Sequence, residues 1–190
     1  MFVLILPSTG ERVQEEEVMS EQQGHGVPDI FTKSVTRQLP SDELEARILA
    51  FLGSRRLCVL ATCRSNVPRA TPILYSSKGF TIYMAGEPGR KLGNISQNPT
   101  VSMAIFDPDA EFSEKIDDIK GLQIGGKARL IGKEDPEFMD AFLMFGRPAS
   151  WAEHWYGKII KVVPDRIELL AMGLKNEGFA ARQIWMRNGR

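Results

Sequence analysis

The amino-acid sequence predicts a mainly β fold, a closed or partly closed β-barrel with a few peripheral helices. Segments of strand length follow one another through most of the chain and are separated by short turns rich in Gly, Pro, Asn and Asp. Strands that are joined by such short connections are antiparallel neighbours. Helical periodicity is confined to a few segments. Many short antiparallel strands with few long helices are typical of a barrel.

Chain length and composition indicate one compact domain. A chain of 190 residues with 43% apolar residues is long enough to bury a sizeable core. We assign residues 41–190 to this domain. Residues 1–40 are polar and lack sustained periodicity, so we expect an N-terminal extension that is flexible or packs on a partner subunit. Met19 within this extension is an alternative start of the protein.

The charge balance and the apolar segments argue against several classes of partner. The 24 Lys and Arg residues balance 24 Asp and Glu residues, whereas a nucleic-acid-binding protein normally carries a basic excess. The apolar opening, residues 1–6, stops at Pro7 and is too short for a signal sequence or a membrane span. We therefore expect a cytoplasmic protein that binds neither nucleic acid nor a membrane.

The cysteine and histidine positions argue against a disulfide and a metal site. Cys58 and Cys63 lie five residues apart in or beside one predicted strand, so on a regular strand their side chains point to opposite faces and cannot pair. The only histidines are His25 and His154, and no spacing typical of metal ligands occurs.

The first expected element is a helix over residues 41–53. Ser41 is a suitable N-cap, and two acidic residues follow in the first turn, where the helix dipole favours anions. Gly53 ends the helix, which we expect to cover the open end of the sheet. Its apolar stripe is formed by Leu44, Ile48, Phe51 and Leu52.

Strands account for most of the remaining chain, and turns, a bulge, a loop and short helical segments interrupt or connect them. Hairpin turns are expected at 78–79 and at Pro164-Asp165, and Gly125-Gly126 marks a bulge or a close approach. An acidic surface loop is expected over 107–118. The expected strands are 57–62, 69–75, 80–85, 101–106, 122–131, 158–163, 166–171 and 183–186. The further helical segments are 90–97, 135–145 and, as a short aromatic turn or helix, 151–156.

Arg90 and Lys91 are the strongest candidates for a binding function. The two cations follow a Gly-Glu-Pro-Gly break and open a helix. A guanidinium, an ammonium and the free N–H groups of a helix N-terminus together suit a phosphate dianion. A pair of solvated surface charges is the alternative interpretation.

Arg69 and Pro72 mark the strand 69–75 as a second candidate. Proline donates no hydrogen bond and is disfavoured in a central strand, so this segment is expected at an edge or against a ligand. An ordinary edge strand fits the same residues.

These segments together resemble the flavin-binding split-barrel superfamily that is named after pyridoxamine 5'-phosphate oxidase. The resemblance rests on the residues of 68–72, on 82–85, on the basic pair at 90–91 with the helix end that follows it, and on 122–128. It extends over residues 44–170. It implies an FMN-binding split barrel of antiparallel Greek-key type, and a homodimer that holds FMN at the subunit interface and acts on a small-molecule substrate.

The resemblance also implies roles for individual residues. Arg90 and Lys91 would bind the FMN phosphate, and Arg69 would bind the phosphate or the polar edge of the ring. The remaining cofactor candidates lie on three predicted strands. They are Ala70, Thr71 and Pro72, whose backbone would lie against the ring, Tyr83, Met84 and Ala85, which would line the same pocket, and Gln123, the candidate for the flavin-binding glutamine. No catalytic residue is identified.

Departures from the pattern define the alternatives. The stretch 167–173 lacks the C-terminal Trp and arginine pair with which the true oxidases hold their substrate, so activity on pyridoxamine phosphate is not expected. A deazaflavin coenzyme, a haem bound through His154, and a flavin-binding module without turnover remain as alternatives to an FMN-dependent oxidoreductase. An aromatic cluster over 151–156 would line a substrate entrance or pack at an interface.

Overall fold

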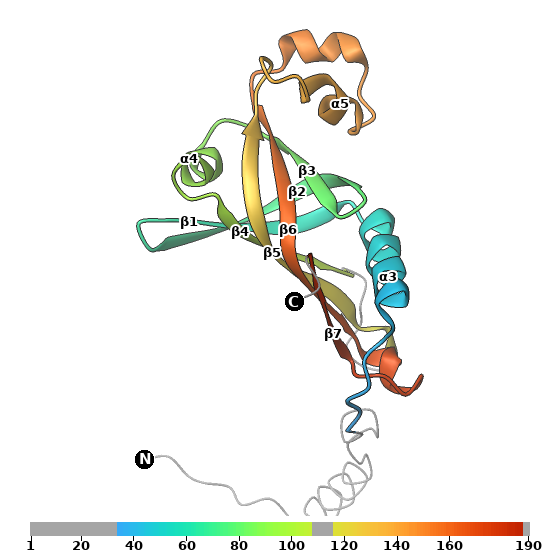
Figure 1. Cartoon of the computed structure of the whole chain (residues 1–190). Coiled ribbons are helices and arrows are strands. Elements are labelled where there is room, and N and C mark those ends of the chain that lie inside the picture. The colour runs from blue at the N-terminus through green and yellow to red at the C-terminus, as the bar shows by residue number, and fades with distance from the viewer. Residues whose placement is uncertain (1–33, 108–115, 188–190) are drawn as a thin grey trace, which may run out of the picture. The chain divides into compact units, whose positions relative to one another are not determined.

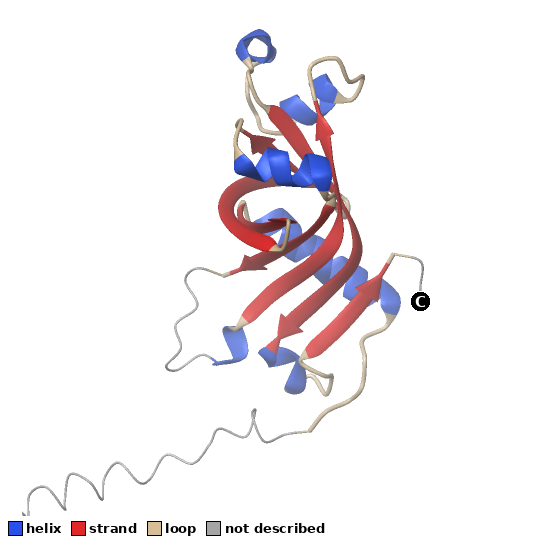
Figure 2. Cartoon of the chain, turned by 90° about the vertical axis from the view of Figure 1, so that its left-hand side faces the viewer, coloured by secondary structure: helices blue, strands red, loops and turns tan. Residues whose placement is uncertain are grey.

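The computed structural model describes residues 34–107 and 116–187, and it confirms the mainly β prediction (Figures 1 and 2). Strands β1–β6 close an antiparallel barrel in the order β3-β2-β1-β4-β5-β6, with β3 paired to β6, and β7 extends the sheet beyond β6. Because β4 returns beside β1 after the β1-β2-β3 meander, the connection is a Greek key, as predicted. The strands are β1 (Leu57–Arg64), β2 (Val67–Lys78), β3 (Thr81–Gly86), β4 (Thr100–Phe106), β5 (Lys120–Ile131), β6 (Lys158–Ala171) and β7 (Arg182–Met186).

Short helices surround this barrel. The helix α4 has the predicted bounds, α3 extends one residue beyond its prediction, and α5 is shorter than predicted because its first three residues form a turn. None of the helices in the described ranges is long and apolar enough to cross a membrane. The helical segments are α3 (Ser41–Ser54), η2 (Ile116–Asp118), α4 (Arg90–Gln97), α5 (Phe138–Leu143), η3 (Ala149–His154) and η4 (Met172–Lys175).

The packed unit begins before α3. The described residues from Val35 onward form one compact unit. Leu39 is buried, and its backbone N–H donates a hydrogen bond of 2.9 Å to Oε1 of the buried Gln183. The last residues of the predicted extension are therefore attached to the barrel. Residues 1–33, which include Met19 and His25, lie outside the described residues, and so does most of the predicted loop 107–118.

The predicted hairpin at Pro164-Asp165 is wrong, because β6 continues through it as one strand. Pro164 is buried and lies opposite Gly126 of β5, where the register shifts and leaves Asp165 as an extra residue. A Cβ atom on Gly126 would lie 2.4 Å from the Val163 carbonyl oxygen. The predicted irregularity at Gly125-Gly126 is thus confirmed, and this bulge accommodates the proline without a turn.

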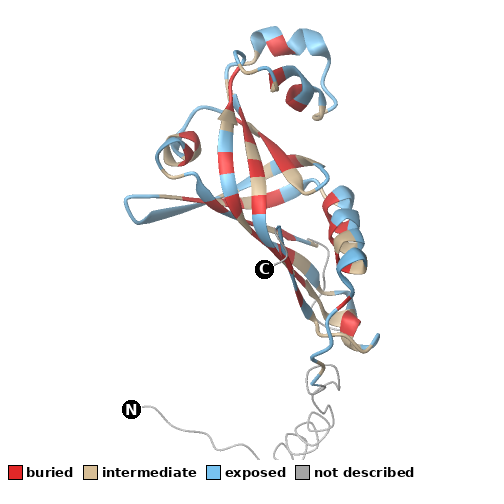
Figure 3. Ribbon diagram, in the orientation of Figure 1, coloured by how far each residue is buried: buried red, intermediate tan, exposed pale blue. Residues whose placement is uncertain are grey.

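Buried and more exposed residues alternate along the strands (Figure 3), because successive side chains of a strand point to opposite faces. Inward-facing residues of all seven strands and α3 form the main core. A second, smaller cluster lies outside the barrel, between β3, β6 and the segment from α5 to η3. Met84 belongs to the first cluster and its neighbour Tyr83 to the second, so adjacent residues of β3 face opposite sides.

A candidate cofactor pocket at the split of the barrel

The barrel opens between β2 and β3. Residues 75–78 of β2 pair with β3, but residues 67–74 pair only with β1. The two strands separate after the pair Tyr75–Met84, so Pro72 lies on a free strand edge, as its presence in a strand predicts. A pocket of about 650 Å³ occupies this split.

Four segments line the pocket. Residues 71–74 of β2 form one wall, Ala85 lies at the end of β3, and Lys91 lies in the first turn of α4. The opposite wall is aromatic and comes from the segment that follows α5. It consists of Phe142, Trp151, Trp155 and Tyr156.

The start of α4 presents cations and backbone donors on one side of this pocket. Gly89, with φ +152°, has a backbone conformation that favours glycine and turns the chain directly from the end of β3 into α4. No side chain caps the helix, so its first N–H groups have no partner within it. Arg90 and Lys91 likewise form no hydrogen bond or ion pair with any described residue.

The position of α4 is fixed by its other side. Leu92 and Ile95 are buried in the main core. The Asn94 side-chain amide donates to Thr62 Oγ1 at 3.0 Å, and the Asn98 amide donates to the Cys63 carbonyl at 3.1 Å. The helix is thereby attached to β1, and its N-terminal turn stays beside the split.

Across the pocket, Arg147 adds a third cation, which no local sequence pattern marks as a binding residue. Gly146, with φ +65°, ends the turn after α5, and Arg147 then lies over the Trp151 ring, 5.6 Å from its centroid. Among the described residues it forms no ion pair. Glu87 is the single acidic residue that lines this pocket, so cations predominate.

Two buried polar atoms around the pocket have no partner among the described residues. They are Thr71 Oγ1 and Trp155 Nε1, and both residues line the pocket. Buried polar groups are nearly always hydrogen-bonded, and an unpaired one costs about 1–3 kcal/mol. Unpaired groups in this place are consistent with a site that another molecule completes.

The structure separates the predicted cofactor residues into two groups. Thr71, Pro72, Ala85 and Lys91 line the pocket, with Arg69, Ala70 and Arg90 exposed on the same strand edge and helix start. The other predicted residues are directed elsewhere. They are Met84, fully buried inside the barrel and 3.9 Å from Cys58 Sγ, Tyr83 in the outer cluster, and Gln123, exposed on β5.

Tyr83 has a structural environment of its own. Its hydroxyl donates a hydrogen bond of 2.8 Å to Glu137 Oε1, and burial, followed by this bond, raises the tyrosine pKa to about 12. Burial disfavours the charged form of Glu137, but hydrogen bonds from Lys161 and Tyr83 and the charge of Arg129 outweigh it and hold the Glu137 pKa below its usual value. Through these contacts Glu137, which directly precedes α5, attaches the start of that helix to β3, β5 and β6.

The buried thiol of Cys58 and the acidic and histidine side chains of the described residues do not form a nucleophile or a metal site at the pocket. Burial raises the Cys58 pKa to about 12, so this thiol stays protonated. Within residues 34–107 and 116–187, no group of three or more His, Cys, Asp and Glu side chains is arranged to hold a metal ion. His154 lines the pocket, is exposed, and has no hydrogen-bond partner among the described residues.

Comparison with known proteins identifies the family. The sequence profile of the family described as pyridoxamine 5'-phosphate oxidase matches residues 44–170, which is more than half of the chain. The chain belongs to the pyridoxamine 5'-phosphate oxidase family. The matched range contains the whole split, from α3 to the end of β6. A search of curated proteins gave no significant match.

Several solved structures share the fold of this chain. An FAD-binding protein from Mesorhizobium loti has 17% identity and a TM-score of 0.52, with 70% of this chain and 93% of the other covered. A haem-binding protein from Mycobacterium smegmatis has 21% identity and a TM-score of 0.58, with 80% and 60% covered. A haem storage protein from Vibrio cholerae has 17% identity and a TM-score of 0.54, with 67% and 94% covered. At these identities the similarity establishes the split-barrel fold of the pyridoxamine 5'-phosphate oxidase family.

Proposed function

We propose that this protein binds FMN in the split between β2 and β3 and acts as an FMN-dependent oxidoreductase on a small-molecule substrate. The observation that carries the proposal is the group of unpaired cations around the pocket, Arg90, Lys91 and Arg147. Lys91 is half-buried, whereas Arg90 and Arg147 are exposed. A half-buried cation is usually paired within a protein, and three cations around one pocket make its electrostatic potential positive, so the pocket favours an anionic ligand. The pocket volume of about 650 Å³ lies within the usual range of ligand sites.

The phosphate would bind at the start of α4. Lys91 lines the pocket and Arg90 precedes it in the same turn, so both can reach a group held at the helix N-terminus. The helix dipole and the free N–H groups favour the same negative charge. Gly89 leaves the approach to these N–H groups open, because no Cβ atom stands there.

The ring would lie along the free edge of β2. The backbone of residues 71–74 has no β3 partner and offers N–H and C=O groups to the polar edge of a planar ligand. Ala85 is small enough to leave room beside it, and Arg69 and Ala70 continue the same edge. Bound FMN would supply the redox chemistry, and the protein would position it and limit water around it.

A second copy of the chain would complete the site. The outer face of the sheet exposes large apolar side chains, where an antiparallel sheet facing solvent normally carries polar ones. Leu74 both belongs to this face and lines the pocket, so a subunit packed on the face would also close the split. We therefore propose a homodimer with FMN at its interface. The exposed apolar residues of this face are Leu57, Leu74, Phe106, Ile184 and Met186.

Gln123 belongs to this proposed interface. The strand register places it in one row with Ala104, Val59 and Pro72, so two strands separate it from the β2 edge. In a homodimer it would contact the partner subunit.

The proposed interface is tested by placing a charge on it. Phe106→Glu should give a monomer in light-scattering measurements, whereas Leu49→Glu, the same kind of apolar-to-acidic substitution at an exposed position of α3, should leave a dimer. A dimer in both variants would contradict the proposed interface.

The cofactor is tested by purification and titration. The absorption spectrum of the purified protein, and of the chromophore released on denaturation, separates FMN, a deazaflavin, haem and an empty site. Arg90→Ala should cost roughly 1.5–3 kcal/mol of FMN affinity, the scale of a hydrogen bond to a charged group. Unchanged FMN binding in this variant would remove the phosphate assignment, and NAD(P)H oxidation by the FMN-loaded protein tests turnover.

A haem protein is the second candidate function. The observation that favours it is His154, which is exposed, unpaired among the described residues and at the mouth of the pocket. An exposed imidazole without a protein partner could ligate haem iron beside the aromatic wall. The haem spectrum of the loaded protein should change in His154→Ala if this function is correct, and FMN binding should then be absent or weak.

A further inference from the structure

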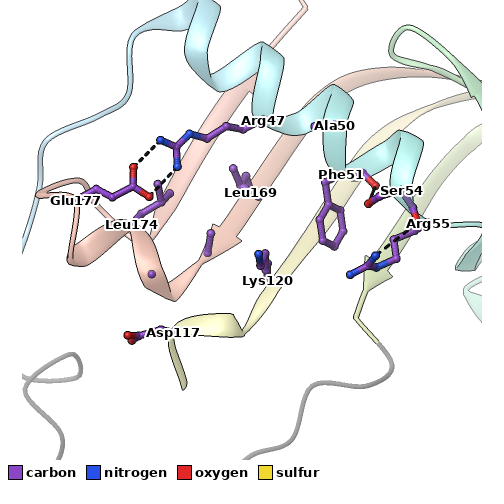
Figure 4. Close-up of a pocket in the computed structure, with 12 residues that line it drawn as sticks. Arg47, Ala50, Phe51, Ser54, Arg55, Asp117, Lys120, Leu169, Leu174 and Glu177 are labelled. Atoms are coloured by element: carbon purple, nitrogen blue, oxygen red, sulfur yellow. Dashed lines mark hydrogen bonds and ion pairs between the residues drawn. The ribbon is translucent and has the colours of Figure 1, made fainter. Parts of the chain in front are cut away.

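A second pocket lies on the other side of the barrel from the split. It has a volume of about 510 Å³ and is formed by α3, the start of β5, the end of β6 and the η4 segment (Figure 4). It shares no lining residue with the pocket at the split. The helices α3 and α4, which flank the two pockets, stand on opposite sides of the barrel in Figure 1.

The inner wall of this second pocket is apolar. Phe51, Leu169 and Leu174 are buried in the main core and present one side to the pocket. Ala50, exposed on α3, leaves space at the rim. A ligand with an apolar body would therefore remove hydrocarbon surface from water here.

Most of the charged groups around the rim are already paired. Arg47 donates to Glu177 at 3.0 and 2.5 Å and to Glu43 at 2.5 Å, and these hydrogen bonds raise its pKa. The Asn176 side-chain amide donates to Asp117 Oδ2 at 2.8 Å. The Arg47–Glu177 pair attaches α3 to the chain directly after η4 and neutralises both charges, whereas Asp117, whose donor is a neutral amide, keeps its negative charge at that end of the pocket.

The other end carries cations with unused donors. The side chain of Lys120 is exposed and forms no hydrogen bond or ion pair with any described residue. Arg55 stacks over the Phe51 ring at 5.3 Å and uses Nη2 for Asp107, while Nη1 makes only a long contact of 3.5 Å to the Ser54 carbonyl. Figure 4 shows the Arg55 guanidinium extending toward Lys120, with the Phe51 ring beside it and Asp117 at the opposite end.

From this arrangement we propose that the second pocket binds an amphipathic monocarboxylate. Its carboxylate accepts hydrogen bonds from Lys120 and Arg55, and its hydrocarbon chain covers Phe51, Leu169 and Leu174. The carboxylate of Asp117, which has a neutral hydrogen-bond donor, also lines the pocket, so a second negative charge on the ligand would be repelled. The same balance disfavours a phosphate dianion, in contrast to the split, where Glu87 is the one acidic lining residue.

Calorimetric titration of the full-length protein with octanoate tests the proposal, with octylammonium as the probe of opposite charge. Octanoate should bind and octylammonium should not. Lys120→Gln should weaken octanoate binding about three- to tenfold, because a partly exposed pair contributes modestly. Ala50→Trp should abolish binding by filling the rim of the pocket.

A matched variant separates the site from general surface charge. Lys78→Gln removes another exposed lysine without a described partner, and its octanoate affinity should equal that of the wild type. Equal octanoate affinity in Lys120→Gln and the wild type, equal affinity in Ala50→Trp, or equal binding of octylammonium would each overturn the proposal. Lys120, Ala50 and Lys78 are all exposed, so we expect the three variants to fold, and their thermal unfolding curves check this.

Discussion

Two seams of this barrel differ in how completely they close. At one seam β5 pairs with β6 along its whole length, from Lys120 to Ile131, and a bulge keeps the pairing continuous past Pro164. At the other, β2 pairs with β3 only over residues 75–78 and then separates from it. The closed seam contributes stability, whereas the split leaves a strand edge, unpaired cations and two unpaired polar atoms around one pocket. Substitutions at the two seams should therefore affect different quantities.

Met84 lies on β3 beside the split, but its side chain belongs to the main core, so its substitution should change stability and leave cofactor binding unchanged. This is the largest expected effect. Its side chain is fully buried in the main core, so Met84→Ala should lower the free energy of unfolding by about 2–5 kcal/mol. Chemical denaturation measures this loss. The FMN affinity of the folded protein should stay unchanged, and Met139→Ala, at an exposed methionine of α5, should lose much less stability. A selective loss of FMN affinity in Met84→Ala would show that Met84 contacts the cofactor.

Gly126 tests the closed seam through backbone contact. A Cβ atom there would lie 2.4 Å from the Val163 carbonyl oxygen, so Gly126→Ala should lower the free energy of unfolding by about 1–3 kcal/mol. Gly125→Ala is the matched control, because nothing lies within 4 Å of a Cβ atom at that position. Equal denaturation midpoints for the two variants would contradict the described geometry of the bulge.

The sequence predicts local features of both seams better than their pairing. The helix 90–97 was predicted with its observed bounds, because Gly89 and the Asn98-Pro99 end are local signals. The β6 strand was predicted as two, because Pro164-Asp165 is typical of a turn and the compensating Gly126 lies on another strand. Such compensation depends on tertiary pairing, which a single segment does not encode.

The candidate site shows the same division. Thr71, Pro72, Ala85 and Lys91 could be predicted because they lie on neighbouring elements. Arg147 reaches the pocket only through the packing of the segment after α5, so no local pattern indicated it. The sequence did contain a signal for Met84. Successive residues of a strand face opposite sides, so Met84 and Ala85 cannot both face the pocket, and Met84 faces the barrel interior.

The ion pair between α3 and the η4 region should have the smallest effect. Arg47 and Glu177 are about one third and one half exposed, so Arg47→Gln should cost about 0.2–1 kcal/mol at neutral pH. The hydrogen bond from Arg47 lowers the Glu177 pKa from its usual 4.5. The pair therefore stabilises the fold fully above pH 4.5, and its contribution disappears as the pH falls through the lowered pKa.

Denaturation of the wild type and Arg47→Gln at several pH values measures this contribution. The difference in the free energy of unfolding should shrink as the pH is lowered below 4.5. Arg64→Gln, an exposed arginine with no partner among the described residues, should show no such pH dependence. A difference that grows toward acid pH would contradict the assigned ion pair.

The central claim is that the unpaired cations at the start of α4 bind the phosphate of a flavin in the split. The most direct test compares FMN with riboflavin, which lacks the phosphate, by titration of the wild type and of Lys91→Ala. The wild type should prefer FMN by about tenfold or more, and Lys91→Ala should lose most of that preference while binding riboflavin as before. An unchanged preference for FMN in Lys91→Ala, or equal binding of both ligands by the wild type, would contradict the claim.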